Sequence, residues 1–390
     1  MLDYNSLYSD RNKAMKPSGI RKFFDIVATM EGAISLGVGE PDFETPWQAR
    51  RSAVKSIENG YTFYTSNAGL LDLRNEISRF INDNYNVNYN PQDEILITVG
   101  GSEAIDNALR SFINEGDEVL IPEPSFVCYT PLTISAGGVP VVIQTKVCDE
   151  FRLTAKDLKE AITEKTKILI LPYPSNPTGA IMEREHLEEI AEVLRDTNII
   201  VISDEIYADL NYYSKHVCFS ELEGMRERTI VISGFSKSFA MTGWRLGYAL
   251  APKELLSPIL KMHQFGIMSA PTASQFAGIT ALTSCTDYIE EMKSEYNLRR
   301  TYLLNQFKRL GLPCFEAKGA FYLFPSIKHT GLSSEEFCEK LLYSKKLAIV
   351  PGNAFGECGE GFVRISYSYS FEHLQEAIVR LEEFLKELSE

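Results

Sequence analysis

The segment IVISGFSKSFAMTGWRLGYAL, residues 230–250, places a lysine and an arginine between two short apolar runs. The β-branched run Ile230–Ile232 predicts a buried strand of a parallel sheet, and Gly247–Leu250 predicts a second short strand. Lys237 lies between them among small and apolar residues, a setting from which a strongly hydrated ammonium gains little unless its amine is used. Together with Arg245, it indicates an imine-forming amine beside an anion-binding group.

Similar apolar runs extend this pattern across the chain. They occur near residues 94, 118, 139, 168, 199, 230 and 247 and alternate with helical stretches. This alternation predicts an α/β/α sandwich with a mainly parallel seven-stranded sheet, and ligands are expected at the carboxyl ends of its strands. We expect a large domain over 48–286, and a smaller α+β domain built from both chain ends, 1–47 and 287–390, with the N-terminal arm packed against it.

The overall composition narrows the classes of function. A chain of 390 residues usually forms about two domains, and a net charge of −14 disfavours nucleic acid or an anionic membrane as a partner. The seven cysteines include no Cys-x-x-Cys pair, which favours free thiols in a reducing cytoplasm. We expect no signal peptide, membrane span or metal site, because no apolar run and no ligand spacing indicates one.

Three further motifs follow predicted strands. The glycine pair in GGSEA (100–104) opens a helix, and a helix N-terminus after a strand is an anion site. NPTG (176–179) follows a strand, and Asp204 in DEIY (204–207) stands at a strand end, where a carboxylate is costly unless it meets a cation. Taken alone, NPTG is also compatible with a plain turn, and Asp204 with a helix N-cap.

In this order, GGSEA, NPTG, DEIY and GFSKSFAMTGWRLGY (234–248) resemble the fold-type I pyridoxal-phosphate aminotransferases of class I/II, and the resemblance covers nearly the whole chain. It implies pyridoxal 5′-phosphate as the cofactor and transfer of an amino group from an L-amino acid to a 2-oxo acid, with 2-oxoglutarate as the expected acceptor. It also implies a homodimer with shared active sites.

The resemblance assigns roles to individual residues. Lys237 would bond to the cofactor aldehyde and move the substrate Cα proton, and Asp204 would keep the pyridine nitrogen protonated. Asn176 and Tyr207 would hold the phenolate oxygen, and Arg245 the phosphate. The other implied cofactor contacts are Gly101, Ser102, Glu103, Phe126 (stacked on the ring), Ser236, and Tyr64 (reaching the neighbouring subunit's phosphate). The implied substrate contacts are Gly39, Asn176, Arg364 (a fork for the α-carboxylate) and Ile20.

The sequence departs from many members at Gly234, where they have serine, so phosphate contacts on that side fall to Ser236 or to backbone. The amino donor stays open among aspartate, aromatic, methionine and N-acyl-diamino acids. The nearest alternative is a carbon–sulfur β-lyase that uses the same site. Two others are a non-catalytic vitamer-binding regulator and a serine hydrolase, although Ser236 lies in a G-x-S-x-S string that lacks the final glycine of the hydrolase motif.

Overall fold

The computed structural model describes residues 2–15 and 30–389. Its centre is a seven-stranded sheet with strand order β2-β8-β7-β6-β5-β3-β4, in which only β8 runs antiparallel to its neighbours. The strands are β2 (Ile95–Thr98), β3 (Glu118–Glu123), β4 (Val139–Gln144), β5 (Thr166–Leu171), β6 (Ile200–Asp204), β7 (Thr229–Gly234) and β8 (Gly247–Leu250). The predicted α/β/α sandwich with a mainly parallel sheet is confirmed.

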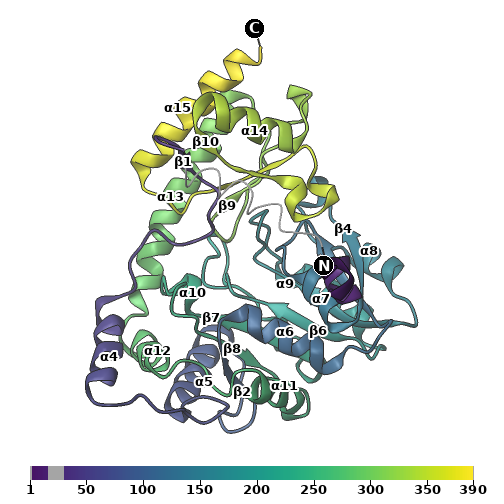
Figure 1. Ribbon diagram of the computed structural model, residues 1–390, viewed down its shortest axis with the longest axis vertical. Coiled ribbons are helices and arrows are strands. Elements are labelled where there is room, and N and C mark those ends of the chain that lie inside the picture. The colour runs from purple at the N-terminus through teal and green to yellow at the C-terminus, as the bar shows by residue number, and fades with distance from the viewer. Residues whose placement is uncertain (1, 16–29, 390) are drawn as a thin grey trace.

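Helices cover both faces of this sheet, which explains why its central strands are apolar along their whole length. One face packs against α6 (Gly101–Phe112) and α11 (Lys253–Gly266) through residues such as Ile202 and Ile232. The other face packs against α9 (Arg184–Leu194) near Val201, and against α5 (Leu71–Tyr85) and α12 (Thr272–Ser284) near Val231 (Figure 1). Two apolar layers therefore fix the sheet and align its strand ends.

A smaller unit stands above the sheet and is reached by the long helix α13 (Asp287–Leu310) (Figure 1). Its strands are β1 (Ile34–Ser35), paired with β10 (Leu347–Ala348), and the antiparallel set β11 (Val350–Pro351), β12 (Val363–Ser366) and β9 (Tyr322–Leu323). The helices α14 (Ser334–Lys345) and α15 (Phe371–Glu387) pack against them. The expected boundary after residue 286 coincides with the start of α13, and the division into two domains stays a prediction.

The described start of the N-terminal arm lies against the large unit. It contains the helices α1 (Tyr4–Leu7) and α2 (Asp10–Ala14), and α2 contacts α7 (Tyr129–Ala136), where the Arg11 guanidinium donates to the Ser135 carbonyl at 3.4 Å. This contact has a physical reason, because the last carbonyls of a helix lack partners within it and attract a cation. The assignment of the N-terminal arm to the small domain stays a prediction.

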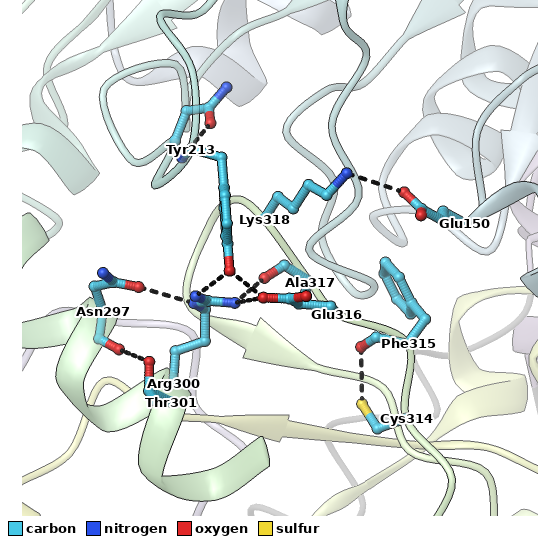
Figure 2. Close-up of polar contacts among 11 residues, drawn as sticks. Glu150, Tyr213, Asn297, Arg300, Thr301, Cys314, Phe315, Glu316, Ala317 and Lys318 are labelled. Carbon is cyan, nitrogen blue, oxygen red and sulfur yellow. Dashed lines mark hydrogen bonds and ion pairs between the residues drawn. The ribbon is translucent and has the colours of Figure 1, made fainter. Parts of the chain in front are cut away.

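A polar cluster around Arg300 of α13 ties the two units together (Figure 2). Arg300 donates to the Ala317 carbonyl at 2.9 Å and to the Tyr213 hydroxyl at 3.1 Å, and Lys318 lies 3.5 Å from the Glu150 carboxylate. These contacts hold the segment that leads into β9 against loops of the large unit. Within the described residues, no helix is long and apolar enough to cross a bilayer.

Candidate active site

A cavity of about 370 Å³ lies at the carboxyl ends of the central strands, between the sheet and the small unit. It brings together most of the side chains that the sequence singled out. These are Gly39, Gly101, Ser102, Phe126, Asn176, Asp204, Tyr207, Ser236, Lys237, Arg245 and Arg364. Those that follow the central strands converge because parallel strands end at one edge, whereas Gly39 and Arg364 are brought in from outside the central sheet.

Lys237 enters this cavity from α10 (Phe235–Ser238), the short helix that follows β7. Its Nζ donates to the Gly39 carbonyl at 2.7 Å and lies 5.8 Å from the centre of the Tyr207 ring. Burial lowers the pKa of Lys237 to about 8, against a smaller opposing effect of the Glu40 carboxylate. A larger fraction of this amine is therefore unprotonated near neutral pH than of an ordinary lysine, as a nucleophile or base requires.

The structure offers a steric reason for a glycine at position 234. A Cβ added at Gly234 would lie 2.8 Å from the Gly247 Cα on the antiparallel strand β8. In this chain the two backbones approach too closely for a side chain at this position unless one of them shifts. Ser236 does line the cavity, two residues further on.

Asp204 is the last residue of β6 and is 7% exposed. Its Oδ2 accepts a hydrogen bond from the Tyr129 hydroxyl at 2.7 Å, and its Oδ1 accepts from the Ile206 N–H at 3.3 Å. Burial raises the pKa of Asp204, so a cationic partner in the cavity would stabilise its charged form. Sequence reasoning missed Tyr129, since nothing in its sequence context separates it from a packing tyrosine.

Tyr207 and Tyr322 form a second pair of polar groups, with hydroxyl oxygens 2.8 Å apart. Burial raises the pKa of both phenols, which keeps them as hydrogen-bond donors at neutral pH. Tyr322 comes from β9 of the small unit and was also missed from the sequence. Its role depends on a contact between chain segments that are more than a hundred residues apart.

Arg364 projects from β12 and is 3% exposed. Its Nη1 donates to Asn176 Oδ1 at 2.8 Å, its Nη2 donates to the Gly37 carbonyl, and its guanidinium lies over the Tyr322 ring at 4.6 Å. Its Nε has no hydrogen-bond partner, and no carboxylate pairs with it, among the residues that the structure describes. Burial lowers the pKa of Arg364, so this guanidinium would gain from an incoming carboxylate.

The anion-binding corner of the cavity is formed by the start of α6 and Arg245. Gly100 precedes α6 with φ of +77°, and a Cβ added there would lie 2.4 Å from Arg245 Nη2. Arg245 donates to the Val99 carbonyl at 3.4 Å and to the Thr242 carbonyl at 3.2 Å. Bare amides at a helix start beside a guanidinium are suited to a phosphate.

Glu103 is not among the residues that line the cavity, and neither is Tyr64, which was expected to reach the neighbouring subunit's site. The Glu103 side chain is turned inward, accepting from the Val99 N–H at 2.6 Å and lying 2.8 Å from His263 Nδ1, so it supports the anion-binding corner from behind. Tyr64 is 77% exposed on the surface. Ile20 lies outside the described residues.

One group of possible metal ligands occurs among the described residues, although no ligand spacing indicated it. Glu183, Glu185 and His186 at the start of α9 have donor atoms within 4.8 Å of one another, and none of them lines the cavity. Glu185 is exposed to solvent, and this group is not part of the candidate active site.

Comparison with known proteins identifies the family. Residues 31–381 match the family described as aminotransferase class I and II. The chain is 45% identical to the aspartate aminotransferase of Pyrococcus abyssi and 43% identical to aromatic-amino-acid aminotransferase 2 of Thermococcus litoralis, each alignment covering 97% of this chain and 98% of the relative. The solved structure of an aromatic aminotransferase from Pyrococcus horikoshii OT3 superimposes with a TM-score of 0.90 at 42% identity, covering 94% of this chain and 99% of that one. The chain therefore belongs to the class I and II aminotransferases, a family of enzymes that use pyridoxal phosphate.

Proposed function

We propose that the cavity around Lys237 moves the amino group of an L-amino acid to 2-oxoglutarate. The observation that carries this proposal is that Lys237, Asp204 and Arg364 all line one cavity, and that no carboxylate of the described residues pairs with Arg364. We infer the donor from the group of aspartate, aromatic, methionine and N-acyl-diamino acids, with aspartate and aromatic donors supported by the names of the relatives above. The alternative of a carbon–sulfur β-lyase finds no support in these relatives.

The residues present fit pyridoxal phosphate. The amine of Lys237 suits the aldehyde, the buried Asp204 carboxylate suits a protonated ring nitrogen, and the cradle at Gly100–Ser102 beside Arg245 suits the phosphate. Phe126 lines the same cavity and offers a flat apolar face to the ring. When bound, the cofactor would supply a reactive aldehyde and an electron-accepting ring.

Lys237, Asp204 and Tyr207 have separate proposed roles in the reaction. The Lys237 amine would take the proton from the substrate Cα and deliver it to the aldehyde-derived carbon of the cofactor, and general base catalysis of this kind contributes roughly 10²–10⁴-fold in rate. Asp204 would keep a proton at the ring nitrogen, and the Tyr129 hydroxyl fixes the direction of its carboxylate. Tyr207, whose hydroxyl lies against that of Tyr322, would donate to the phenolate oxygen.

Arg364 positions the substrate. Its guanidinium fork binds the α-carboxylate, and the Asn176 side-chain oxygen fixes the plane of that fork by accepting from Nη1. The centres of the Tyr322 and Phe355 rings lie 4.6 Å and 4.7 Å from the guanidinium carbon, and these rings shield it from water. Binding of the carboxylate thereby places the Cα near the Lys237 amine.

We further propose a cytoplasmic homodimer in which Tyr64 contributes to the neighbouring active site. Tyr64 and Phe63 lie on one loop and Phe265 lies near the end of α11, and their side chains are exposed by 77%, 80% and 89%. The loop is joined to the α11–α12 connection by hydrogen bonds from Thr272 to the Phe63 carbonyl at 2.7 Å and from Asn67 to the Met268 carbonyl at 2.9 Å. An exposed aromatic surface of this kind is typical of a protein–protein interface.

Substitution of the lysine tests the central assignment. Lys237→Ala should abolish turnover and the visible absorbance of the lysine-bound cofactor, and transamination at near wild-type rate would refute the role. A screen of amino donors with 2-oxoglutarate on the wild-type enzyme identifies the donor. Release of pyruvate and ammonia from a cysteine conjugate without added 2-oxo acid would instead indicate the lyase.

A further inference from the structure

Asp209 lies behind the catalytic lysine, on the turn that follows β6. This turn begins at Asp204 and is closed by hydrogen bonds from the Ala208 N–H to the Glu205 carbonyl and from the Leu210 N–H to the Tyr207 carbonyl, both at 2.9 Å. Asp204, Tyr207 and Asp209 thus belong to one hydrogen-bonded turn. Asp204 and Tyr207 line the active-site cavity, whereas Asp209 lines a different cavity on the outer side of the turn.

Each oxygen of the Asp209 carboxylate accepts one hydroxyl. Ser238 Oγ, from the residue directly after Lys237, donates to Oδ2 at 2.5 Å, and the Tyr85 hydroxyl donates to Oδ1. Ser238 and Tyr85 are buried, at 3% and 8% exposure. Burial, followed by the nearby Asp209 charge, raises the pKa of Tyr85 well above its usual value, so the phenol stays a donor.

No ion pair to Asp209 is found among the described residues. The outer cavity, of about 560 Å³, lies between the end of α5, the turn and the start of α13. Its other charged or titratable side chains are Arg79, Asp83, Tyr85, Lys215, His216, Asp287, Glu290 and Lys293. A partly buried carboxylate without a cation is costly unless hydrogen bonds compensate it, and here the two hydroxyls do so.

The helix that carries Lys237 needs such an external contact. The helix α10 has only 4 residues, and its end is closed by a hydrogen bond from the Phe239 N–H to the Phe235 carbonyl at 3.2 Å. Helices this short have little stability of their own and depend on tertiary contacts. Phe235 and Phe239 pack in the same apolar cluster as Tyr85 and Ala208, which anchors the helix on its apolar side.

We propose that Asp209 is a positioning residue that ties the helix carrying Lys237 to the turn carrying Asp204 and Tyr207. One carboxylate thereby fixes the lysine amine relative to the groups that hold the ring nitrogen and the phenolate oxygen. This inference rests on the proposed role of Lys237. It predicts that loss of Asp209 disturbs proton transfer more than substrate binding, because Arg364 lies on a different element, β12.

The first test compares Asp209→Ala with the wild-type holoenzyme. A misplacement of about 1 Å at a reacting group can cost roughly 10²-fold in rate, so kcat should fall about 10- to 100-fold while the donor KM stays within about twofold. The second readout is the rate at which an amine-acylating reagent labels Lys237 in the cofactor-free protein, followed by mass spectrometry across pH. The midpoint of this labelling should rise from about 8 towards the ordinary 10.5 as the amine becomes less buried.

The control is Asp83→Ala, which removes the same charge from the same outer cavity but contacts neither hydroxyl. It should keep the wild-type kcat and labelling midpoint. Because Asn offers one acceptor and one donor, Asp209→Asn should retain more activity than Asp209→Ala. Ser238→Ala should lower kcat in the wild-type background but add little to Asp209→Asn, since residues of one network are not additive.

A folded Asp209→Ala variant with wild-type kcat and an unchanged labelling midpoint would overturn the proposal, as would equal effects of Asp83→Ala. If Asp209→Ala does not fold, Ser238→Ala and Tyr85→Phe decide the question by the same two readouts, since each removes a single hydroxyl. Lys237→Ala distinguishes a failure of the proposed function from a failure of the positioning role of Asp209. An active Lys237→Ala refutes the function, whereas an inactive Lys237→Ala beside a fully active Asp209→Ala refutes only the positioning role.

Discussion

Arg364 in the active-site cavity and Arg300 at the base of the small unit are both 3% exposed, yet they have different partners. Arg300 donates to Asn297, to the Ala317 carbonyl and to the Tyr213 hydroxyl, and lies 3.5 Å from the Glu316 carboxylate (Figure 2). Arg364 donates only to neutral oxygens and keeps an unpartnered Nε among the described residues.

The contrast shows how a structural arginine differs from a ligand-binding one. A buried charge whose counter-charge lies within the chain is already compensated, so removing its partner is costly and a ligand adds little to it. A buried charge that contacts only neutral dipoles and ring faces has no counter-charge. A carboxylate ligand can supply one and form a charge-assisted hydrogen bond. Partner type, rather than burial, separates these two residues.

Arg364→Gln should produce the largest effect on function. Loss of the fork removes a charge-assisted contact to the substrate carboxylate, so kcat/KM for the amino donor should fall about 100-fold or more, mainly through KM. The melting temperature should change little, because no carboxylate in the described chain loses its partner. Steady-state kinetics and thermal unfolding test this together. An unchanged donor KM would contradict the assignment of Arg364 as the ligand-binding arginine.

Arg300→Gln should give the reverse pattern. The unfolding free energy should fall by about 2 kcal/mol, because hydrogen bonds from a charged group contribute about 1.5–3 kcal/mol and their buried acceptors lose a donor. The donor KM should stay within about twofold. Urea denaturation at fixed protein concentration measures the unfolding free energy. A higher donor KM without a loss of stability would mean that Arg300 and Arg364 do not differ in role.

Lys237 is a partly buried cation, and its charge should be visible in the pH dependence of stability. Its folded-state pKa of about 8 lies below the ordinary 10.5, so the unfolded chain binds more protons between these values. The unfolding free energy of the cofactor-free protein should therefore gain a contribution as pH rises across this window. Lys237→Met should reduce that rise by about 1–3 kcal/mol in denaturation curves at pH 8 and pH 10.5, and parallel curves would contradict the prediction.

Arg309→Ala should show the smallest effect. Arg309 donates to the Glu382 carboxylate at 2.7 Å, but both side chains lie at the surface, where water and salt screen the pair. The melting temperature should match that of the wild type within error at physiological salt. A clear loss of stability would mean that exposure is not what separates this ion pair from the Arg300 cluster.

The sequence predicted some residues of the site better than others. Asp204, Lys237 and the GGSEA corner could be placed because each follows a buried strand, and the ends of neighbouring parallel strands share an edge. Tyr129 and Tyr322 could not, because their importance comes from single hydrogen bonds across long sequence separations. The contact of α2 with α7 was not predicted, since an exposed polar arm contains no pattern that selects its neighbour.

The sequence by itself determined the α/β/α sheet, the family and most of the side chains that line the cavity. It could do so because strand and helix periodicity, turn residues and motif spacing are local properties of the chain. Only the tertiary structure decided which partner each charge has. Whether Arg364 meets a carboxylate, whether Glu103 faces the cavity, and whether Asp209 joins two catalytic elements depend on contacts between distant segments, and no local pattern records these contacts.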